Sequence, residues 1–308
     1  MPKRTLIILC FHVITLASFG QLNAPDSQRV NKKRLLIVAG ANAAFWTGSY
    51  IALNKAWYAD YPKTSFHTFD DLPEWNQMDK AGHIWTTYQV GRASAELWKW
   101  TGLNNNTSAI LGGATGIVYQ GIIEFQDAYS EEWGFSWSDI GANFIGAGLF
   151  VLQETGWKEQ RIQIKMSYWP ADYSADLKSR RNQLFGKSFA ERILKDYNSQ
   201  TYWISANISS FLKESNVPKW LNISFGYGAD GLLGGRSNVW SDKEGTVFDY
   251  SSIKRERRFY LSPDIDLTRI KTNSKLLRSV LFALNVIKIP APALELNNQG
   301  KMRFHILK

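Results

Sequence analysis

The sequence predicts an α+β protein, with an N-terminal four-helix region followed by a C-terminal antiparallel β region. Residues 35–157 contain long apolar stretches with helical spacing, whereas residues 158–308 contain short segments in which apolar and polar residues alternate. The periodicity changes near residue 158. The predicted organisation is therefore a signal peptide at 1–20, a flexible lead-in at 21–34, a helical domain at 35–157 and a mostly antiparallel β domain at 158–308.

The first twenty residues have the features of a secretory signal peptide. A basic start is followed by the apolar run 5–19, and residues 18–20 supply small side chains at the two positions that a signal peptidase reads. We expect cleavage before Gln21, and an uncleaved membrane anchor is the alternative. The only cysteine is Cys10, inside the apolar run. The mature chain would therefore contain no disulfide and no thiolate site, although it is exported.

The composition favours an anionic partner. The chain has a net charge of +9, a pI near 9.4 and 13 Trp, 13 Tyr and 17 Phe residues. Basic charge suits lipid headgroups, and aromatic side chains gather at interfaces and at membrane–water boundaries. A large aromatic core explains the aromatic share equally well. No nucleic-acid-binding motif accompanies the charge, so we expect no nucleic-acid partner.

The first predicted helix, 35–53, has two interpretations. Its length and its basic and aromatic flanks fit a span across a bilayer, and the same pattern fits a buried helix of a soluble bundle. Gly40, Ala44 and Gly48 recur every four residues, which predicts a face for close helix packing. Whether 35–53 and 107–125 span a membrane is left open by the sequence.

Three further helices are predicted at 78–101, 107–127 and 138–157. Thr107 is the expected N-cap of the second of these, and Ser136 or Ser138 that of the third. The helix at 107–127 is apolar almost all round and rich in glycine, which weakens it alone but suits tight packing against a neighbour. Its glycines are Gly112, Gly113, Gly116 and Gly121.

The second half of the chain shows strand periodicity. In 260–268, polar residues fall on one face and apolar residues on the other, which is the strongest of these patterns. About six strands favour a soluble sheet, although the same alternation also fits a membrane barrel. The strands are expected at 161–168, 202–209, 220–228, 259–270, 281–289 and 302–307, with a short helix at 188–197.

Polar residues recur at helical spacing in three of the four helices, which is the main functional signal of the sequence. Each pair shares one face of its helix, because its members are three or four residues apart. An up–down–up arrangement with short connections brings the start of 78–101, the end of 107–127 and the start of 138–157 to one end. The candidate catalytic residues that we expect to converge there are Asp79, His83, Glu124, Asp127, Asp139 and Asn143.

Such a cluster has three interpretations. The side chains can satisfy one another as a buried structural network. Alternatively, His83, Glu124, Asp127 and Asp139 can ligate zinc, manganese or iron. In the third interpretation His83 is a general base oriented by Asp79. The sequence contains no serine nucleophile elbow, phosphate loop, dinucleotide fingerprint or zincin motif, and it identifies no cofactor.

At these residues the sequence resembles the YfiM-like family of predicted periplasmic lipoproteins, a domain of unknown function. The motif is Asp79-Lys80-x-x-His83, then Glu124-x-x-Asp127, then Gly134-Phe-Ser-Trp-Ser-Asp139 and Gly146, and it covers about residues 75–155. The motif is more distantly similar to that of VanZ-like membrane proteins, and the whole layout resembles long exported proteins of Bacteroidetes-type bacteria. The resemblance implies the periplasm or outer membrane of a Gram-negative-type bacterium and no particular reaction. The chain departs from the lipoprotein pattern, because it has no lipobox cysteine.

Two functions follow as hypotheses. The first is a membrane-associated scaffold or lipid-binding protein of the cell envelope, motivated by the basic, aromatic-rich composition. The alternative is an envelope enzyme that acts on lipid-linked or cell-wall substrates through the His/carboxylate cluster. The expected partner is membrane lipid or another envelope component, and the sequence identifies neither protein partners nor an oligomeric state.

Overall fold

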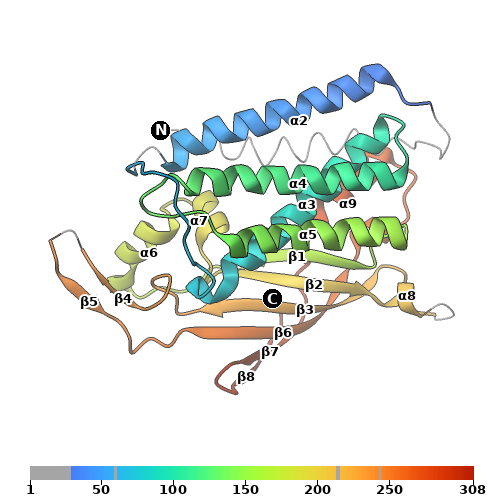
Figure 1. Ribbon diagram of the computed structural model, residues 1–308. Helices are drawn as coiled ribbons and strands as arrows, with labels where there is room; N and C mark the ends of the chain where they lie inside the picture. Colours follow the sequence, from blue (N-terminus) through green and yellow to red (C-terminus); the bar gives the residue numbers. More distant parts are fainter. Residues whose placement is uncertain (1–28, 59–60, 213–215, 243) are drawn as a thin grey trace. The chain divides into compact units, whose positions relative to one another are not determined.

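The computed structural model describes residues 29–58, 61–212, 216–242 and 244–308. The predicted signal peptide, its cleavage before Gln21, Cys10 and most of the predicted lead-in lie outside the described residues. The α+β class is confirmed, since helices in the first half are followed by an antiparallel sheet in the second (Figure 1). The predicted domain boundaries themselves stay predictions.

By its internal contacts the chain forms two compact units. The first comprises the described part of Met1–Asp71 together with His83–Arg161 and Ile270–Leu284. The second comprises Leu72–Gly82, Ile162–Arg269 and Asn285–Lys308.

The first unit is helical. Asn104, not Thr107, is the N-cap of α4, because its side chain accepts the backbone N–H of Thr107 at 2.9 Å. Ser136 caps α5, as one of the two predicted alternatives. The helices are α2 (Lys32–Leu53), the larger part of α3 (Met78–Trp100), α4 (Asn105–Asp127), α5 (Trp137–Gly156) and α9 (Lys275–Leu284), with a π-helical turn at Asn54–Tyr58.

Three helices of this unit approach one another closely at glycine. A Cβ at Gly112 would overlap the carbonyl oxygen of Gly91 on α3, and a Cβ at Gly116 would lie 2.6 Å from the carbonyl oxygen of Thr87. A Cβ at Gly113 would lie 2.5 Å from the side chain of Val151 on α5. Gly112, Gly113 and Gly116 therefore admit neighbours on two sides of α4, as the sequence predicts, whereas a Cβ at Gly121 would meet nothing within 4 Å among the described residues. Helices α4 and α5 lie side by side (Figure 1).

Helix α2 differs from that prediction. A Cβ at Gly40 or Gly48 would meet nothing within 4 Å among the described residues, so this small-residue face is not a site of close packing there. Instead α2 contacts α4 through stacked rings of Phe45 and Tyr119, 5.0 Å apart. Within the described residues α2 is the one helix long and apolar enough to cross a membrane, and few of its residues are buried. A signal sequence or a soluble core helix passes the same test of length and composition.

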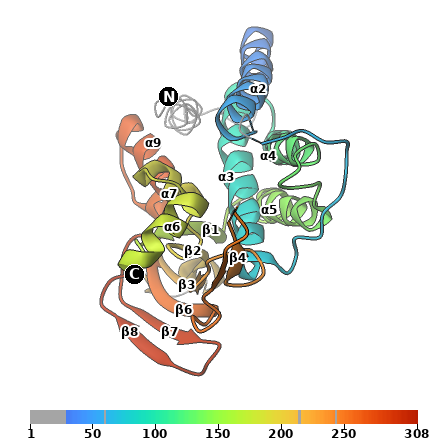
Figure 2. The same cartoon turned by 90° about the vertical axis from the view of Figure 1, so that its left-hand side faces the viewer.

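The second unit is built on a six-stranded sheet in the order β1-β2-β3-β6-β7-β8, with every neighbouring pair antiparallel. The sheet curls from β3 through β6 to β7 and β8 (Figure 2). Its strands are β1 (Ile162–Tyr168), β2 (Gln200–Asn207), β3 (Leu221–Asp230), β6 (Glu256–Ile265), β7 (Ala293–Asn297) and β8 (Met302–His305). Smaller elements are β4 (Val239–Ser241), β5 (Val247–Asp249), α6 (Lys178–Phe185), α7 (Phe189–Lys195), α8 (Ile208–Phe211) and the 3-10 helices Glu74–Gln77, Ala175–Leu177 and Leu267–Arg269.

One predicted strand, 281–289, is wrong. Residues 281–284 are the last turn of α9, and Ile287 makes an isolated bridge with Met166. The short apolar run at 281–284 fits either structure, because periodicity alone does not separate a buried strand from the end of a helix. The strand β7 was not predicted, although its residues alternate between buried and exposed.

The two faces of the sheet differ sharply in polarity. On one face, a row of directly paired residues runs Lys165, Trp203, Gly226, Tyr260 and Glu295 across five strands, and the four side chains in it are almost fully buried. The Nζ of Lys165 lies 2.8 Å from a carboxylate oxygen of Asp264, and both side chains are fully buried. The opposite face is apolar and largely exposed. The polar face of the sheet is therefore buried, and its apolar face is exposed.

Candidate functional site

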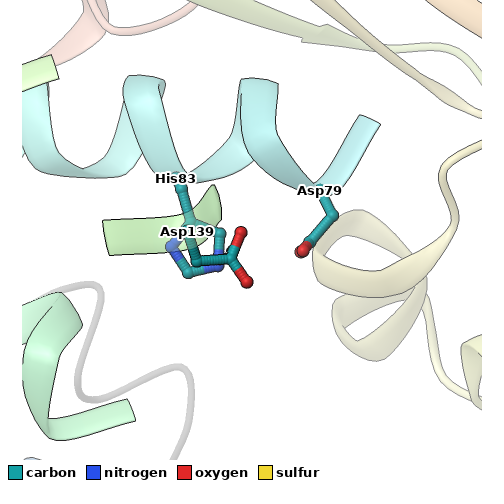
Figure 3. Close-up of side chains that lie close together, drawn as sticks. All are labelled: Asp79, His83 and Asp139. Atoms are coloured by element: carbon teal, nitrogen blue, oxygen red, sulfur yellow. Dashed lines mark ion pairs between the residues drawn. The ribbon is translucent and has the colours of Figure 1, made fainter. Parts of the chain in front are cut away.

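The site centres on the imidazole of His83, which points from α3 toward two carboxylates. Its Nε2 lies 3.6 Å from Oδ1 of Asp139 on α5 (Figure 3). The same nitrogen lies 3.8 Å from Oε1 of Glu124 on α4. Antiparallel packing of α3 on α4 and of α4 on α5 produces this meeting, because it brings the start of α3, the end of α4 and the start of α5 together. The structure thus brings four of the predicted side chains, His83, Glu124, Asp139 and Asn143, together from three helices.

The other ring nitrogen of His83 faces two amides. Nδ1 lies 3.0 Å from Oδ1 of Asn143 and 3.0 Å from Nε2 of Gln120. Thr87 donates to the same Asn143 oxygen at 3.1 Å. If Nδ1 carries the proton, it donates to Asn143 Oδ1, and Nε2 presents its lone pair to the carboxylates. If Nδ1 is bare, Gln120 donates to it and Nε2–H faces the carboxylates.

Burial makes this arrangement electrostatically demanding. Glu124, Asp139 and Asn143 are 1%, 4% and 0% exposed, and the side chain of His83 is 12% exposed. Two buried carboxylates beside one imidazole disfavour the state in which both carry charge without a compensating cation. A positive charge held beside these two carboxylates would therefore be favoured.

Ser136 joins the two carboxylates through the start of α5. Its backbone N–H donates to Oε2 of Glu124 at 3.2 Å, and its Oγ accepts the N–H of Asp139 at 3.1 Å. The same hydroxyl donates to Asp71 at 2.6 Å, and Ser138 donates to Asp71 at 2.7 Å. The cap of the helix therefore also fixes the direction of Glu124, which leaves Oε1 as the oxygen facing His83.

Asp127 has a different partner from the rest of the predicted set. The hydroxyl of Tyr58 donates to Oδ1 of Asp127 at 2.5 Å. Burial, and then the negative charge of Asp127, raise the pKa of Tyr58 above its ordinary value. Asp127 thus ties the π-helical turn after α2 to the end of α4.

Asp79 lies on α3 one turn before His83 (Figure 3). By its contacts it belongs to the second unit, where Tyr197 donates to it at 2.9 Å and Lys80 pairs with it at 2.9 Å. Its predicted role as the group that orients the imidazole stays a prediction.

Sequence reasoning missed Gln120, Thr87 and Ser136 as members of the site. Gln120 precedes Glu124 by one turn and Thr87 follows His83 by one turn, so each shares the inward face of its neighbour. A polar residue one turn from a candidate ligand in an apolar helix is the signal that would have found them. The predicted catalytic roles of the six residues stay predictions.

The comparisons with known proteins agree with the resemblance found in the sequence. No curated protein and no solved structure is significantly similar to the chain. The more distant VanZ-like similarity and the Bacteroidetes-type layout stay predictions. The family whose model matches is described as one of predicted periplasmic lipoproteins, which supports an exported, cell-envelope location. The segment that carries His83, Glu124 and Asp139, residues 69–155, matches the family model of the predicted periplasmic lipoproteins (DUF2279).

Proposed function

We propose that this envelope protein binds membrane lipid through the exposed apolar face of its six-stranded sheet. One observation carries the proposal. A ladder of directly paired apolar residues crosses all the strands of this sheet. Except for Ile164 on β1, which is buried, these side chains are 42–69% exposed. The ladder is Ile164, Ile204, Phe225, Leu261, Leu294 and Phe304.

The neighbouring rows extend this surface, which we call the apolar ladder face. Ile223, Leu296 and Met302 lie two residues along their strands from ladder positions and are also exposed. An antiparallel sheet with one face in water normally buries its apolar face and solvates its polar one. Here the polarity is reversed. An exposed, contiguous apolar surface is typical of a site of interaction with protein or membrane.

The residues at the two ends of the sheet favour lipid as the ligand of the apolar ladder face. Trp169 directly follows β1 and Trp220 directly precedes β3, and both are exposed. Because β1 and β3 both run antiparallel to β2, these two residues lie at opposite ends of the sheet. Tryptophan is enriched at both boundaries of a membrane, where its ring sits at the headgroups. The net charge of +9 adds attraction to anionic headgroups.

Vesicle sedimentation tests the proposal. We expect the purified protein to pellet with phosphatidylglycerol vesicles, less with phosphatidylcholine vesicles, and less at high salt, because exposed charges are screened. The double variant Ile204→Ser, Phe225→Ser should bind at least roughly 10-fold more weakly, given about 25 cal/mol per Å² of apolar surface withdrawn from water. Val247→Ser is the matched control, since Val247 is 64% exposed on β5, outside the six-stranded sheet.

Two results would overturn the proposal. One is binding that the double variant and the control reduce equally. The other is a dimer in sedimentation velocity that the double variant dissociates, with no binding to either vesicle, because a second copy would then cover the face.

A second candidate function is acid–base catalysis at His83 on a lipid-linked or cell-wall substrate. The observation that favours it is the imidazole held between two amides and two carboxylates. The probes are isolated cell-wall sacculi and phospholipid vesicles, with released products detected by mass spectrometry. We expect His83→Ala to abolish release while keeping the thermal unfolding transition. Loss of the transition along with release would favour the structural network instead.

A further inference from the structure

We infer that His83, Glu124 and Asp139 form a binding site for a divalent transition-metal ion such as zinc, manganese or iron(II). The inference is independent of the lipid proposal, because all three residues belong to the helical unit and none lies on the sheet.

The first support is the spacing of the ligand atoms. The separations of Nε2 from the two carboxylate oxygens, 3.6 and 3.8 Å, are longer than those of hydrogen bonds. An ion at roughly 2.0–2.2 Å from each ligand in tetrahedral geometry separates its ligand atoms by about 3.4 Å. Each of these two separations therefore needs to close by only a few tenths of an ångström for His83 to share an ion with that carboxylate.

The second support is the environment of the other imidazole nitrogen. A histidine that binds a metal through Nε2 keeps its proton on Nδ1 and donates it to an oxygen, which fixes the ring. Asn143 Oδ1 stands at that place, 3.0 Å from Nδ1. In this orientation the Nδ2 of Asn143 has no hydrogen-bond partner among the described residues, although Asn143 is fully buried. A protonated Nδ1 explains why the amide keeps its oxygen toward the ring, and Gln120 can turn its own amide to present oxygen as well.

The third support is that the Glu124 carboxylate and the backbone of Asp139 are both held in place. The Ser136 N–H holds Oε2 of Glu124, and the cap geometry of Ser136 holds the backbone of Asp139. A preformed site of this kind loses less conformational freedom when the ion binds.

The ligand set decides the class of ion. One imidazole with two carboxylates is a mixed nitrogen and oxygen set, which zinc, manganese and iron(II) accept. Calcium and magnesium prefer oxygen ligands alone and are the expected poor binders. Three protein ligands leave a further coordination position for water or a substrate, as in catalytic rather than structural zinc sites.

Metal titration of the purified, metal-stripped protein tests the inference. We expect one zinc or manganese ion per chain by isothermal titration calorimetry, with magnesium far weaker, and a rise in the melting temperature on binding. Cobalt(II) provides a spectroscopic signature through its visible absorption bands. His83→Ala and Asp139→Asn should weaken binding by more than the roughly 10–100-fold that changes behind the ligands cost. Asn143→Ala should fall within that range.

The controls use two other histidines. His67 is held by the carbonyl of Trp133 at 2.6 Å and His305 by Glu295 at 2.7 Å, away from the three ligands in sequence. His67→Ala and His305→Ala should leave the stoichiometry and affinity unchanged. Zinc binding that survives both His83→Ala and Asp139→Asn would overturn the inference, as would the absence of stoichiometric binding by the native protein. If His83→Ala fails to fold, the near-isosteric Asp139→Asn and Glu124→Gln variants decide the question.

Discussion

Gly146 lies so close to Ile84 that a Cβ at position 146 would overlap the carbonyl oxygen of Ile84. Ile84 follows His83, and Gly146 follows Asn143 by about one turn of α5. This contact sets how closely α5 approaches α3, and with it the reach of Asn143 to the imidazole.

We therefore expect Gly146→Ala to destabilise the protein by about 1–3 kcal/mol, the usual cost of overpacking a tight interface. Gly148→Ala is the matched control, because a Cβ at Gly148 would have no atom of the described residues within 4 Å of it. Alanine in a helix interior is favoured over glycine by about 0.5–1 kcal/mol, so Gly148→Ala should make the protein more stable. Urea denaturation measures both, and two changes of the same sign would contradict the packing argument.

Helical spacing and the short connections between the helices predicted the meeting of His83, Glu124 and Asp139, because three antiparallel helices joined in this way allow few other arrangements. The glycines were less informative. Gly40 and Gly112 look alike in the sequence, yet only Gly112 meets a neighbouring backbone. A small-residue pattern shows where a close approach is permitted, and the partner's surface decides whether it happens.

The contacts of Ser136 with Asp71 and Glu124 were beyond the sequence for a similar reason. Capping is local, and Ser136 was one of the two predicted caps, whereas Asp71 reaches it from a loop 65 residues earlier in the chain. Loop conformation over such a separation depends on tertiary contacts that no local pattern encodes. The inverted polarity of the sheet was also hidden, because alternation fixes which residues share a face but not which face is exposed.

Ser136→Ala should lower the free energy of unfolding by about 0.5–2 kcal/mol, the usual cost of losing an N-cap. Ser138→Ala is the control, since Ser138 also donates to Asp71 but does not cap α5. The two variants should differ further in metal titration, where Ser136→Ala weakens binding because the backbone of Asp139 is less firmly held. Equal losses of stability and affinity in the two variants would show that the bond to Asp71, and not the cap, is what matters.

The buried pair of Lys165 and Asp264 should be the most sensitive ionic contact of the sheet. Lys165→Met leaves the buried carboxylate without its ion-pair partner, and removing one partner of a buried pair costs about 3–5 kcal/mol. Arg236→Ala is the control, because the Arg236 side chain is 55% exposed in its pair with Glu74. Surface pairs contribute roughly 0–1 kcal/mol. Chemical denaturation measures the free energy of unfolding of both variants. Losses of equal size would show that burial does not make the Lys165–Asp264 pair more important than the exposed pair.

The free energy of unfolding should depend on pH through Lys288, and the direction of this dependence can be derived. Burial, together with the charge of Lys165, lowers the pKa of Lys288 to about 8, against the opposing effect of Asp264. Between about pH 8 and the ordinary lysine pKa of 10.5, the unfolded chain keeps a proton that the folded chain has released. The unfolded state then binds more protons, so the contribution of Lys288 to stability rises with pH across this window. Other groups titrate there as well, so the measurement is the difference in slope of unfolding free energy against pH between the native protein and Lys288→Met. The native slope should be the more positive one, and parallel slopes would mean that the folded state does not lower the pKa of this lysine.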